Sequence, residues 1–167
     1  MERVSEFEKV SFEQFYKAVT DFYDEEQARL LYESLQLPTR ATSGSAGYDF
    51  HAPFSFVLPA GKSILIPTGI RAKIEDGWFL GIFPRSSLGF KYNAMFANTI
   101  PVVDSDYYGS DNEGHIFLSI VNRSKNKSEM SIVAGDKLAQ GVFIPFGITQ
   151  SDDVIAQRNG GIGSTGA

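Results

Sequence analysis

The chain has 167 residues, 43% of them hydrophobic, a composition that suits one soluble domain with a sizeable core. It holds no cysteine, which excludes a disulfide framework and a cysteine-ligated zinc site, and its formal net charge of −5 argues against polymeric nucleic acid as the main partner. The N-terminal residues lack the basic start and apolar run of a signal peptide, and no apolar run approaches membrane-spanning length. We therefore expect a cytoplasmic protein with no membrane partner.

Residues 1–37 predict a helical N-terminal extension. A capping-box pattern opens each of two short helices, Ser11 with Gln14 and Asp24 with Gln27. Apolar residues at helical spacing follow each cap. We expect these helices to pack on the core or on a neighbouring subunit; an arm that binds another protein is the alternative.

Residues 38–150 show a different pattern, in which short apolar, β-branched and aromatic runs alternate with turn residues. Examples are residues 54–58, 63–66 and 116–121. Regular short strands punctuated by Gly and Pro predict an all-β sandwich or barrel. The two histidines of the chain, His51 and His115, are isolated and lack ligand spacing, so we expect them to be surface or strand residues.

One turn of this β region combines three kinds of chemistry. Val103 and its neighbour predict a buried strand that enters a hairpin, and Asn98, Asp104 and Tyr107 flank it. An amide can pair with a base edge, a carboxylate can orient a water, and a flat ring can lie against a sugar. Asp104 and Asp106 could instead merely cap the turn, and Tyr107 could be a core or interface tyrosine.

The tail, residues 151–167, is rich in glycine and poor in apolar residues from Arg158 onward. It could be a frayed terminus. Alternatively, glycine-rich backbone beside Arg158 and the hydroxyls of Ser164 and Thr165 could cradle a phosphate. The residues of the tail alone leave both interpretations open.

Five segments in this order resemble the five motifs of the homotrimeric dUTP diphosphatase (dUTPase) family, of bacterial or phage type. The resemblance covers the chain from about Leu37 to its end, and five ordered motifs are far more specific than any one of them. The segments are residues 45–50 (SAGYDF), 84–89 (PRSSLG), 98–109, 135–140 (GDKLAQ) and 158–166 (RNGGIGSTG).

The resemblance implies a fold, an assembly and a reaction. The fold would be a dUTPase-like jelly-roll or β-barrel, and the assembly a homotrimer with shared active sites. The reaction would be Mg²⁺-assisted hydrolysis of dUTP to dUMP and pyrophosphate, which keeps uracil out of DNA and supplies dUMP for thymidylate synthesis.

The resemblance also implies roles for residues around the phosphates. Asp104 would orient the attacking water, and Asp49 would reach the magnesium through water, the ion being held mainly by the triphosphate. Phosphate contacts would come from Arg85, Gln140 and two serines, Ser86 and Ser87. The second of these serines stands where the family often has Gly.

Further residues would hold the nucleoside and close over it. Asn98 and backbone groups around Val103 would read uracil, and Tyr107 would lie under the deoxyribose and leave no room for a 2′-hydroxyl. The tail would form a mobile lid (151–167) over a neighbouring subunit's site. Its contacts would come from Arg158 on the γ-phosphate, Ile162 over the base, where the family usually has Phe, and Gly163, Ser164 and Thr165.

Two other functions stay open on the sequence. A dCTP deaminase shares the fold, but the pairing of Asp104 with Tyr107 fits the diphosphatase better. A dUTPase-like regulatory protein that binds a repressor could coexist with catalysis. The helical extension and residues 110–114, which lengthen the hairpin after Tyr107, motivate this second alternative.

Overall fold

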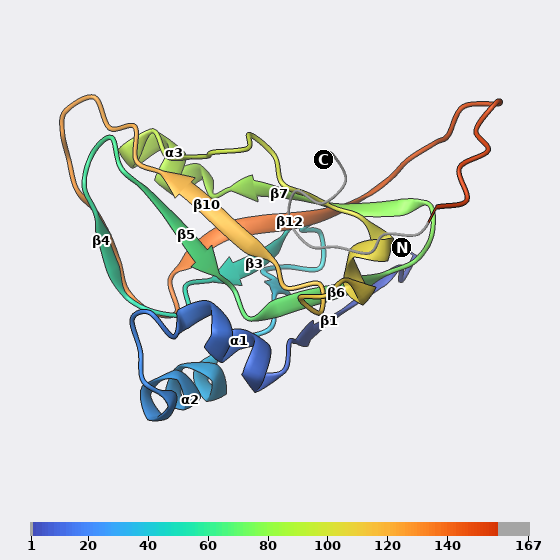
Figure 1. Cartoon of the computed structure of the whole chain (residues 1–167). Coiled ribbons are helices and arrows are strands. Elements are labelled where there is room, and N and C mark those ends of the chain that lie inside the picture. Colours follow the sequence, from blue (N-terminus) through green and yellow to red (C-terminus); the bar gives the residue numbers. More distant parts are fainter. Residues whose placement is uncertain (1, 157–167) are drawn as a thin grey trace.

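The computed structural model describes residues 2–156, which form a mainly antiparallel β structure (Figure 1). Its largest sheet has five strands, in the order β2-β3-β12-β7-β9. Two long strands at its centre pair over most of their length, and β9 lies at one edge. The strand bounds are β2 Thr39–Arg40, β3 Tyr48–His51, β12 Lys137–Pro145, β7 Trp78–Pro84 and β9 Val102–Val103.

The other strands form three smaller sheets. Three strands pair in the order β5-β10-β8, and two pairs, β4-β11 and β1-β6, complete the β structure. The predicted all-β class is therefore confirmed. The bounds are β5 Ser63–Pro67, β10 Phe117–Val121, β8 Met95–Phe96, β4 Phe56–Leu58, β11 Met130–Ile132, β1 Ser5–Lys9 and β6 Ile70–Ile74.

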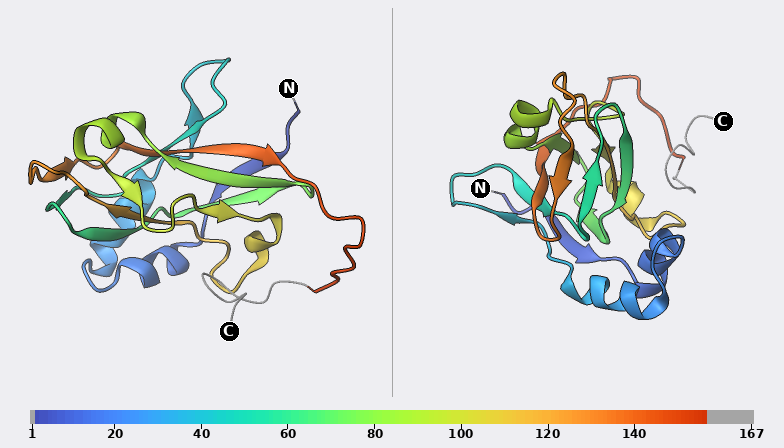
Figure 2. Two further views of the ribbon diagram at one scale, coloured as in Figure 1. Left: turned by 90° about the horizontal axis from the view of Figure 1, so that it is seen from above. Right: turned by 90° about the vertical axis from the view of Figure 1, so that its left-hand side faces the viewer.

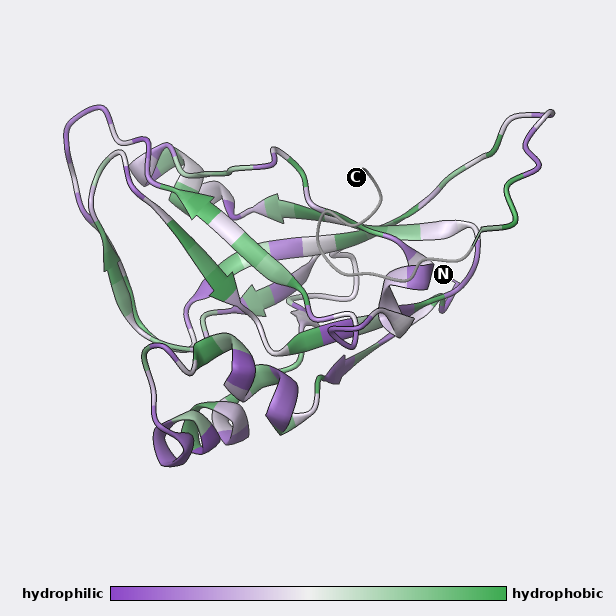
Figure 3. Cartoon of the chain, in the orientation of Figure 1, coloured by the Kyte–Doolittle hydropathy of each residue, from purple (hydrophilic) through white to green (hydrophobic). Residues whose placement is uncertain are grey.

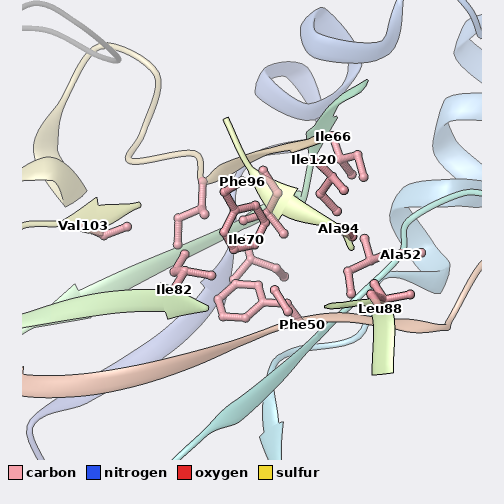
Figure 4. Packing of buried hydrophobic residues seen from close by; sticks show 14 of the residues in the cluster. Phe50, Ala52, Ile66, Ile70, Ile82, Leu88, Ala94, Phe96, Val103 and Ile120 are labelled. Carbon is pink, nitrogen blue, oxygen red and sulfur yellow. The ribbon is translucent and has the colours of Figure 1, made fainter. Parts of the chain in front are cut away.

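Side chains from the large sheet and from the three-stranded sheet fill one core (Figure 4). Phe50 and Ile82 of the large sheet belong to the same cluster as Ile66 and Ile120 of the smaller one, and all four are almost completely buried. In β10 the buried Leu118 and Ile120 alternate with partly exposed residues, as expected for a strand with one buried face. In Figure 3 β4, β5 and β10 are mostly green (hydrophobic), whereas β1 is purple (hydrophilic).

The N-terminal extension contains the two predicted helices, α1 Phe12–Val19 and α2 Glu25–Ser34. The Ser11 hydroxyl caps α1, and Asp24 with Gln27 forms the reciprocal capping box of α2. Both helices lie along one end of the β structure (Figures 1 and 2). Their packing is close: a Cβ at Gly69 would collide with a methyl carbon of Leu35, the residue that follows α2. The extension thus packs on the core of its own chain.

The expectation of an entirely helical extension was wrong for Ser5–Lys9. These residues form β1, which pairs antiparallel with β6 so that Glu8 lies opposite Arg71. Glutamate and lysine are poor strand formers, so local propensity gives no strand signal here. The strand exists because β6 offers a free edge beside it.

Beyond β12 the described chain runs through residues 146–156, which are exposed and extend away from the body (Figure 1). The short helix α3, Ser86–Tyr92, and the 3₁₀ turn η1, Ser105–Gly109, complete the elements. Within residues 2–156, no helix has the length and apolar character needed to cross a membrane.

Candidate active site

Three predicted site residues gather where β3, β7 and β12 lie side by side. Asp49, Arg85 and Gln140 line a common cavity of about 530 Å³. Gln140 lies directly opposite Asp49 in the β12–β3 pairing, and Arg85 follows the last residue of β7. The structure therefore brings together the carboxylate, guanidinium and amide that the motifs place far apart in sequence.

The charges in this cavity favour an anion. The Asp49 side chain is 11% exposed, and Lys137 Nζ lies 2.7 Å from one of its oxygens. Arg85 Nη1 lies 3.4 Å from the other oxygen. Two cations thus surround one carboxylate and leave a surplus positive charge. Guanidinium and ammonium groups in such a pocket are suited to phosphate oxygens.

Lys137 was not among the predicted site residues, although it stands in the segment 135–140 that resembles the fourth motif. Along a regular strand Lys137 and Gln140 would point to opposite faces. The register of β12 against β3 shifts between Lys137 and Ala139, which is a bulge, and both side chains reach the same cavity. A bulge of this kind redirects a side chain. Sequence alternation alone gives no sign of it.

Gly47 in the first motif has a packing role. A Cβ at this position would lie 2.8 Å from the side-chain oxygen of Gln140. A larger residue would therefore force the Gln140 amide to shift. Ser86 and Ser87 are exposed at the start of α3. Ser87 lines an adjoining cavity of about 580 Å³ that it shares with Arg85 and Lys137.

The remaining described site residues lie on the hairpin around β9. Asn98 is exposed in the turn between β8 and β9, and Val103 is buried in β9. Asp104 is exposed at the start of η1, and its side chain makes no capping hydrogen bond to that turn. This observation disfavours the alternative that Asp104 merely caps the turn.

Tyr107 is almost buried, at 7% exposure, and its hydroxyl is fixed on both sides. The hydroxyl donates to the carbonyl oxygen of His115 at 2.8 Å and accepts from Asn112 Nδ2 at 2.7 Å. The ring is therefore held in one place relative to the hairpin. A contact between this ring and a sugar stays a prediction.

The two groups of residues do not meet within one chain. Val103 pairs with Leu80, so Asp104 lies beside the start of β7, whereas Arg85 follows its end. By this register Asp104 is opposite Phe79, six residues before Arg85. At a strand rise of about 3.3 Å per residue, the two side chains originate roughly 20 Å apart. Arg158, Ile162, Gly163, Ser164 and Thr165 lie outside the described residues.

His115, which was expected at the surface or in a strand, is instead completely buried just before β10. Its Nε2 accepts a hydrogen bond from the Gly69 amide at 2.9 Å, while Nδ1 has no hydrogen-bond partner. Burial lowers the pKa of the imidazole from 6.5 to about 4, against a smaller opposing effect of Glu113.

This histidine predicts a loss of stability in mild acid. In the unfolded chain His115 binds a proton below pH 6.5, whereas in the folded protein it does so only near pH 4. The free energy of unfolding therefore falls as the pH is lowered from 6.5 to 4, by roughly 3 kcal/mol in total. Urea unfolding between pH 4 and 7.5, at fixed protein concentration, would measure it. We expect His115→Gln to flatten the dependence; equal pH slopes for variant and parent would contradict the assignment.

The fold and the site together define a class of protein, and comparison with known proteins identifies it. Residues 33–166 match the sequence model of the family described as dUTPase. The chain therefore belongs to the dUTPase family, and its class of enzyme is dUTP diphosphatase. The predicted family and its jelly-roll-like fold are confirmed.

Individual relatives agree with this assignment. The chain is 39% identical over 136 residues to the deoxyuridine 5'-triphosphate nucleotidohydrolase of Lactococcus lactis subsp. lactis (strain IL1403), covering 80% of this chain and 89% of that protein. A solved dUTPase from Streptococcus mutans is similar with a TM-score of 0.64 and 34% identity, over 86% and 97% of the two chains. A mutant dUTPase from phage phi11 of S. aureus, described with a structural Mg(II) ion, shares the fold at 22% identity, with a TM-score of 0.61 over 77% and 95% of the chains.

Proposed function

We propose that this chain hydrolyses dUTP to dUMP and pyrophosphate at sites shared between the subunits of a homotrimer. One observation carries the proposal: within one chain, the cationic cavity and the hairpin around β9 lie roughly 20 Å apart along β7. A site that uses both needs the hairpin of one subunit beside the cavity of another. Closed homo-oligomers supply such contacts by symmetry.

In this proposal the hairpin selects the nucleoside. The exposed Asn98 amide and backbone groups near Val103 pair with uracil, and the fixed ring of Tyr107 lies under the deoxyribose. Polar groups left unpaired by the wrong base discriminate strongly. A rigid ring leaves no space for a 2′-hydroxyl, so ribonucleotides are excluded by the same hairpin.

The chemical step is an in-line attack at the α-phosphorus. Asp104 orients a water and accepts its proton as the oxygen bonds to phosphorus. The bond from the α-phosphorus to the bridging oxygen breaks, and pyrophosphate leaves with that electron pair. Arg85, Lys137 and Gln140, with the hydroxyls of Ser86 and Ser87, hold the charged phosphates. Positioning and electrostatic stabilisation supply most of the catalysis in phosphoryl transfer.

The donor set fits a magnesium ion held mainly by the substrate. Among the described residues that line the cavity, Asp49 is the single carboxylate, and both of its oxygens already contact cations. Within residues 2–156 no group of three or more His, Cys, Asp or Glu could hold a metal. Magnesium commonly uses one carboxylate and several waters together with substrate phosphates, so Asp49 would reach it through water. When bound, the ion would neutralise charge on the triphosphate.

The test of the function is pyrophosphate release from dUTP, UTP, dTTP and dCTP, each with magnesium and with excess chelator. We expect fast, magnesium-dependent release from dUTP alone. In a cell this activity would keep uracil out of DNA and supply dUMP for thymidylate synthesis. Formation of a uracil nucleotide from dCTP would favour the deaminase, and no release from any nucleotide would favour a regulatory protein that binds a repressor.

A further inference from the structure

We infer that the N-terminal extension positions the nucleoside hairpin, holding the segment 105–115 at two points through Glu113 and Glu8. This inference rests on the proposed function, because that segment carries Tyr107. The extension reaches the segment from the far end of the sequence, and β1, β6 and η1 lie close together in Figure 1. Glu113 and Glu8 would be positioning residues that act through Tyr107 and its neighbour Tyr108.

The first anchor joins residues 102 positions apart in sequence. Glu113 accepts hydrogen bonds from the Ser11 backbone amide at 2.7 Å and from the Ser11 hydroxyl at 2.6 Å. The same hydroxyl accepts from the Gln14 amide at the start of α1. Partial burial alone would raise the pKa of the Glu113 carboxyl, but the two bonds from Ser11, together with the charges of Arg71 and His115, outweigh it, so the pKa is lowered. The carboxylate is thus a charged cap that ties the hairpin to α1.

The backbone at this anchor is strained, and the contacts hold it there. Glu113 has a φ of 58°, a left-handed conformation that L-residues other than Asn and Asp seldom adopt. Gly114 follows with a φ of 70°, and a Cβ there would lie 2.8 Å from the Cα of Tyr108. Strain of this kind persists where surrounding contacts over-determine the conformation. The loop therefore folds directly back onto Tyr107 and Tyr108.

Side chains of the loop then reach Tyr107 itself. Asn112 donates to the Tyr107 hydroxyl, and the Ser110 hydroxyl donates to the Tyr107 carbonyl at 2.6 Å. The Asn112 side-chain oxygen accepts from the Gly114 amide and lies 2.9 Å from the Ser110 hydroxyl, as a second acceptor for its single proton. A displacement of Glu113 would be transmitted to the tyrosine through this short network. The lengthened hairpin, residues 110–114, is thus the link between α1 and the ring.

The second anchor holds Tyr108, the next residue along η1. The Tyr108 hydroxyl donates to Glu8 at 2.9 Å, and Arg71 donates to the same oxygen through two nitrogens. The Arg71 guanidinium also lies 4.4 Å from the centre of the Tyr108 ring. The hydrogen bond from Tyr108 is the largest cause of the lowered pKa of Glu8. Strand β1 therefore contacts η1 through Glu8, and the start of α1 contacts the loop after η1 through Ser11.

Loss of these two anchors is expected to affect the selection of the sugar rather than the chemical step. Asp104 precedes η1 and orients the water, whereas the two anchors fix the tyrosines that follow it. Loosening the anchors should let the Tyr107 ring move and make room for a 2′-hydroxyl. We expect a higher KM for dUTP and a smaller preference for dUTP over UTP, with kcat for dUTP changing much less.

The experiment compares Glu113→Ala with two reference variants. Asp111→Ala removes a carboxylate from the same loop, where Asp111 is exposed, and serves as the matched control. Glu113→Gln keeps one acceptor oxygen and should recover part of the parent behaviour. Steady-state kinetics with dUTP and UTP are combined with hydrogen exchange of residues 105–115 and with thermal unfolding of each variant.

For Glu113→Ala we expect a roughly tenfold fall in the ratio of kcat/KM for dUTP to that for UTP, the size of losing a charge-assisted hydrogen bond. Exchange should quicken in residues 105–115, with Asp111→Ala matching the parent. The inference would be overturned if the dUTP-to-UTP ratio of kcat/KM and the hydrogen exchange were both unchanged. It would also be overturned if kcat/KM fell equally for both nucleotides and Tm fell, because that result indicates a purely structural role. If the parent itself fails to hydrolyse dUTP, the proposed function fails, and exchange alone decides whether the extension fixes the hairpin.

Discussion

Replacing Asp104 by Asn is expected to lower turnover of dUTP by about 10²–10⁴-fold, the usual range for loss of a general base, while leaving nucleotide binding nearly intact. The amide keeps the shape of the side chain but cannot accept the proton of the attacking water. In the structure Asp104 is exposed beside the buried Val103 of β9, and Asn keeps the size of the side chain, so the replacement should not unfold the hairpin.

Two measurements separate chemistry from binding. Pyrophosphate release under saturating dUTP gives turnover, and calorimetry with a non-hydrolysable dUTP analogue gives affinity. Asp106→Asn is the matched control, because Asp106 is a second exposed carboxylate two residues further along the same turn. We expect it to remain close to the parent. Full activity in Asp104→Asn would remove Asp104 from the mechanism, and a large loss of affinity would assign it to binding instead.

Two inactive variants are expected to restore activity when they assemble together. Asp104→Asn lacks the water-orienting carboxylate, and Arg85→Ala lacks a phosphate ligand, which should cost about 10²–10³-fold in kcat by analogy with other charge-stabilising donors. Since the two residues originate roughly 20 Å apart within a chain, a complete site takes Asp104 from one subunit and Arg85 from another. In a trimer that contains both variants, roughly one third of the sites should have both residues intact.

The two variants would carry different affinity tags, be co-expressed, and be purified over both tags before pyrophosphate release is measured. Homogeneous preparations of each variant, mixed after assembly, are the control and should stay inactive. Activity of the co-assembled protein no higher than the average of the two variants would place the whole site within one subunit. A second pair, Asp104→Asn with Gln140→Ala, checks that the result does not depend on the Asp49–Arg85 contact.

Several elements of this protein follow from local sequence. The caps at Ser11 and Asp24 were predicted because a capping hydrogen bond joins residues three positions apart, so both partners stand in one short stretch. The β class was predicted from short apolar runs and turn residues for the same reason. The order of five motifs was enough to identify the family, and three residues from separate motifs, Asp49, Arg85 and Gln140, do line one cavity.

Other features depend on contacts that no local pattern contains. Lys137 enters the cavity because β12 bulges against β3, and a bulge is a property of the pairing of two strands. β1 forms where β6 offers an edge, although its own residues are poor strand formers. His115 is buried where α1 packs on the β structure, with the rings of Phe15 on α1 and Phe117 on β10 beside it.

By itself, then, the sequence determined the helix caps, the β class, the family and the chemistry of the motifs, since hydrogen-bond and hydrophobic patterns over a few residues specify these. The tertiary structure decided which residues share a site. It placed Asp104 and Arg85 at opposite ends of β7, and it joined Ser11 to Glu113 across 102 positions. Such arrangements depend on strand register and on the packing of distant segments, which are settled only when the whole chain has folded.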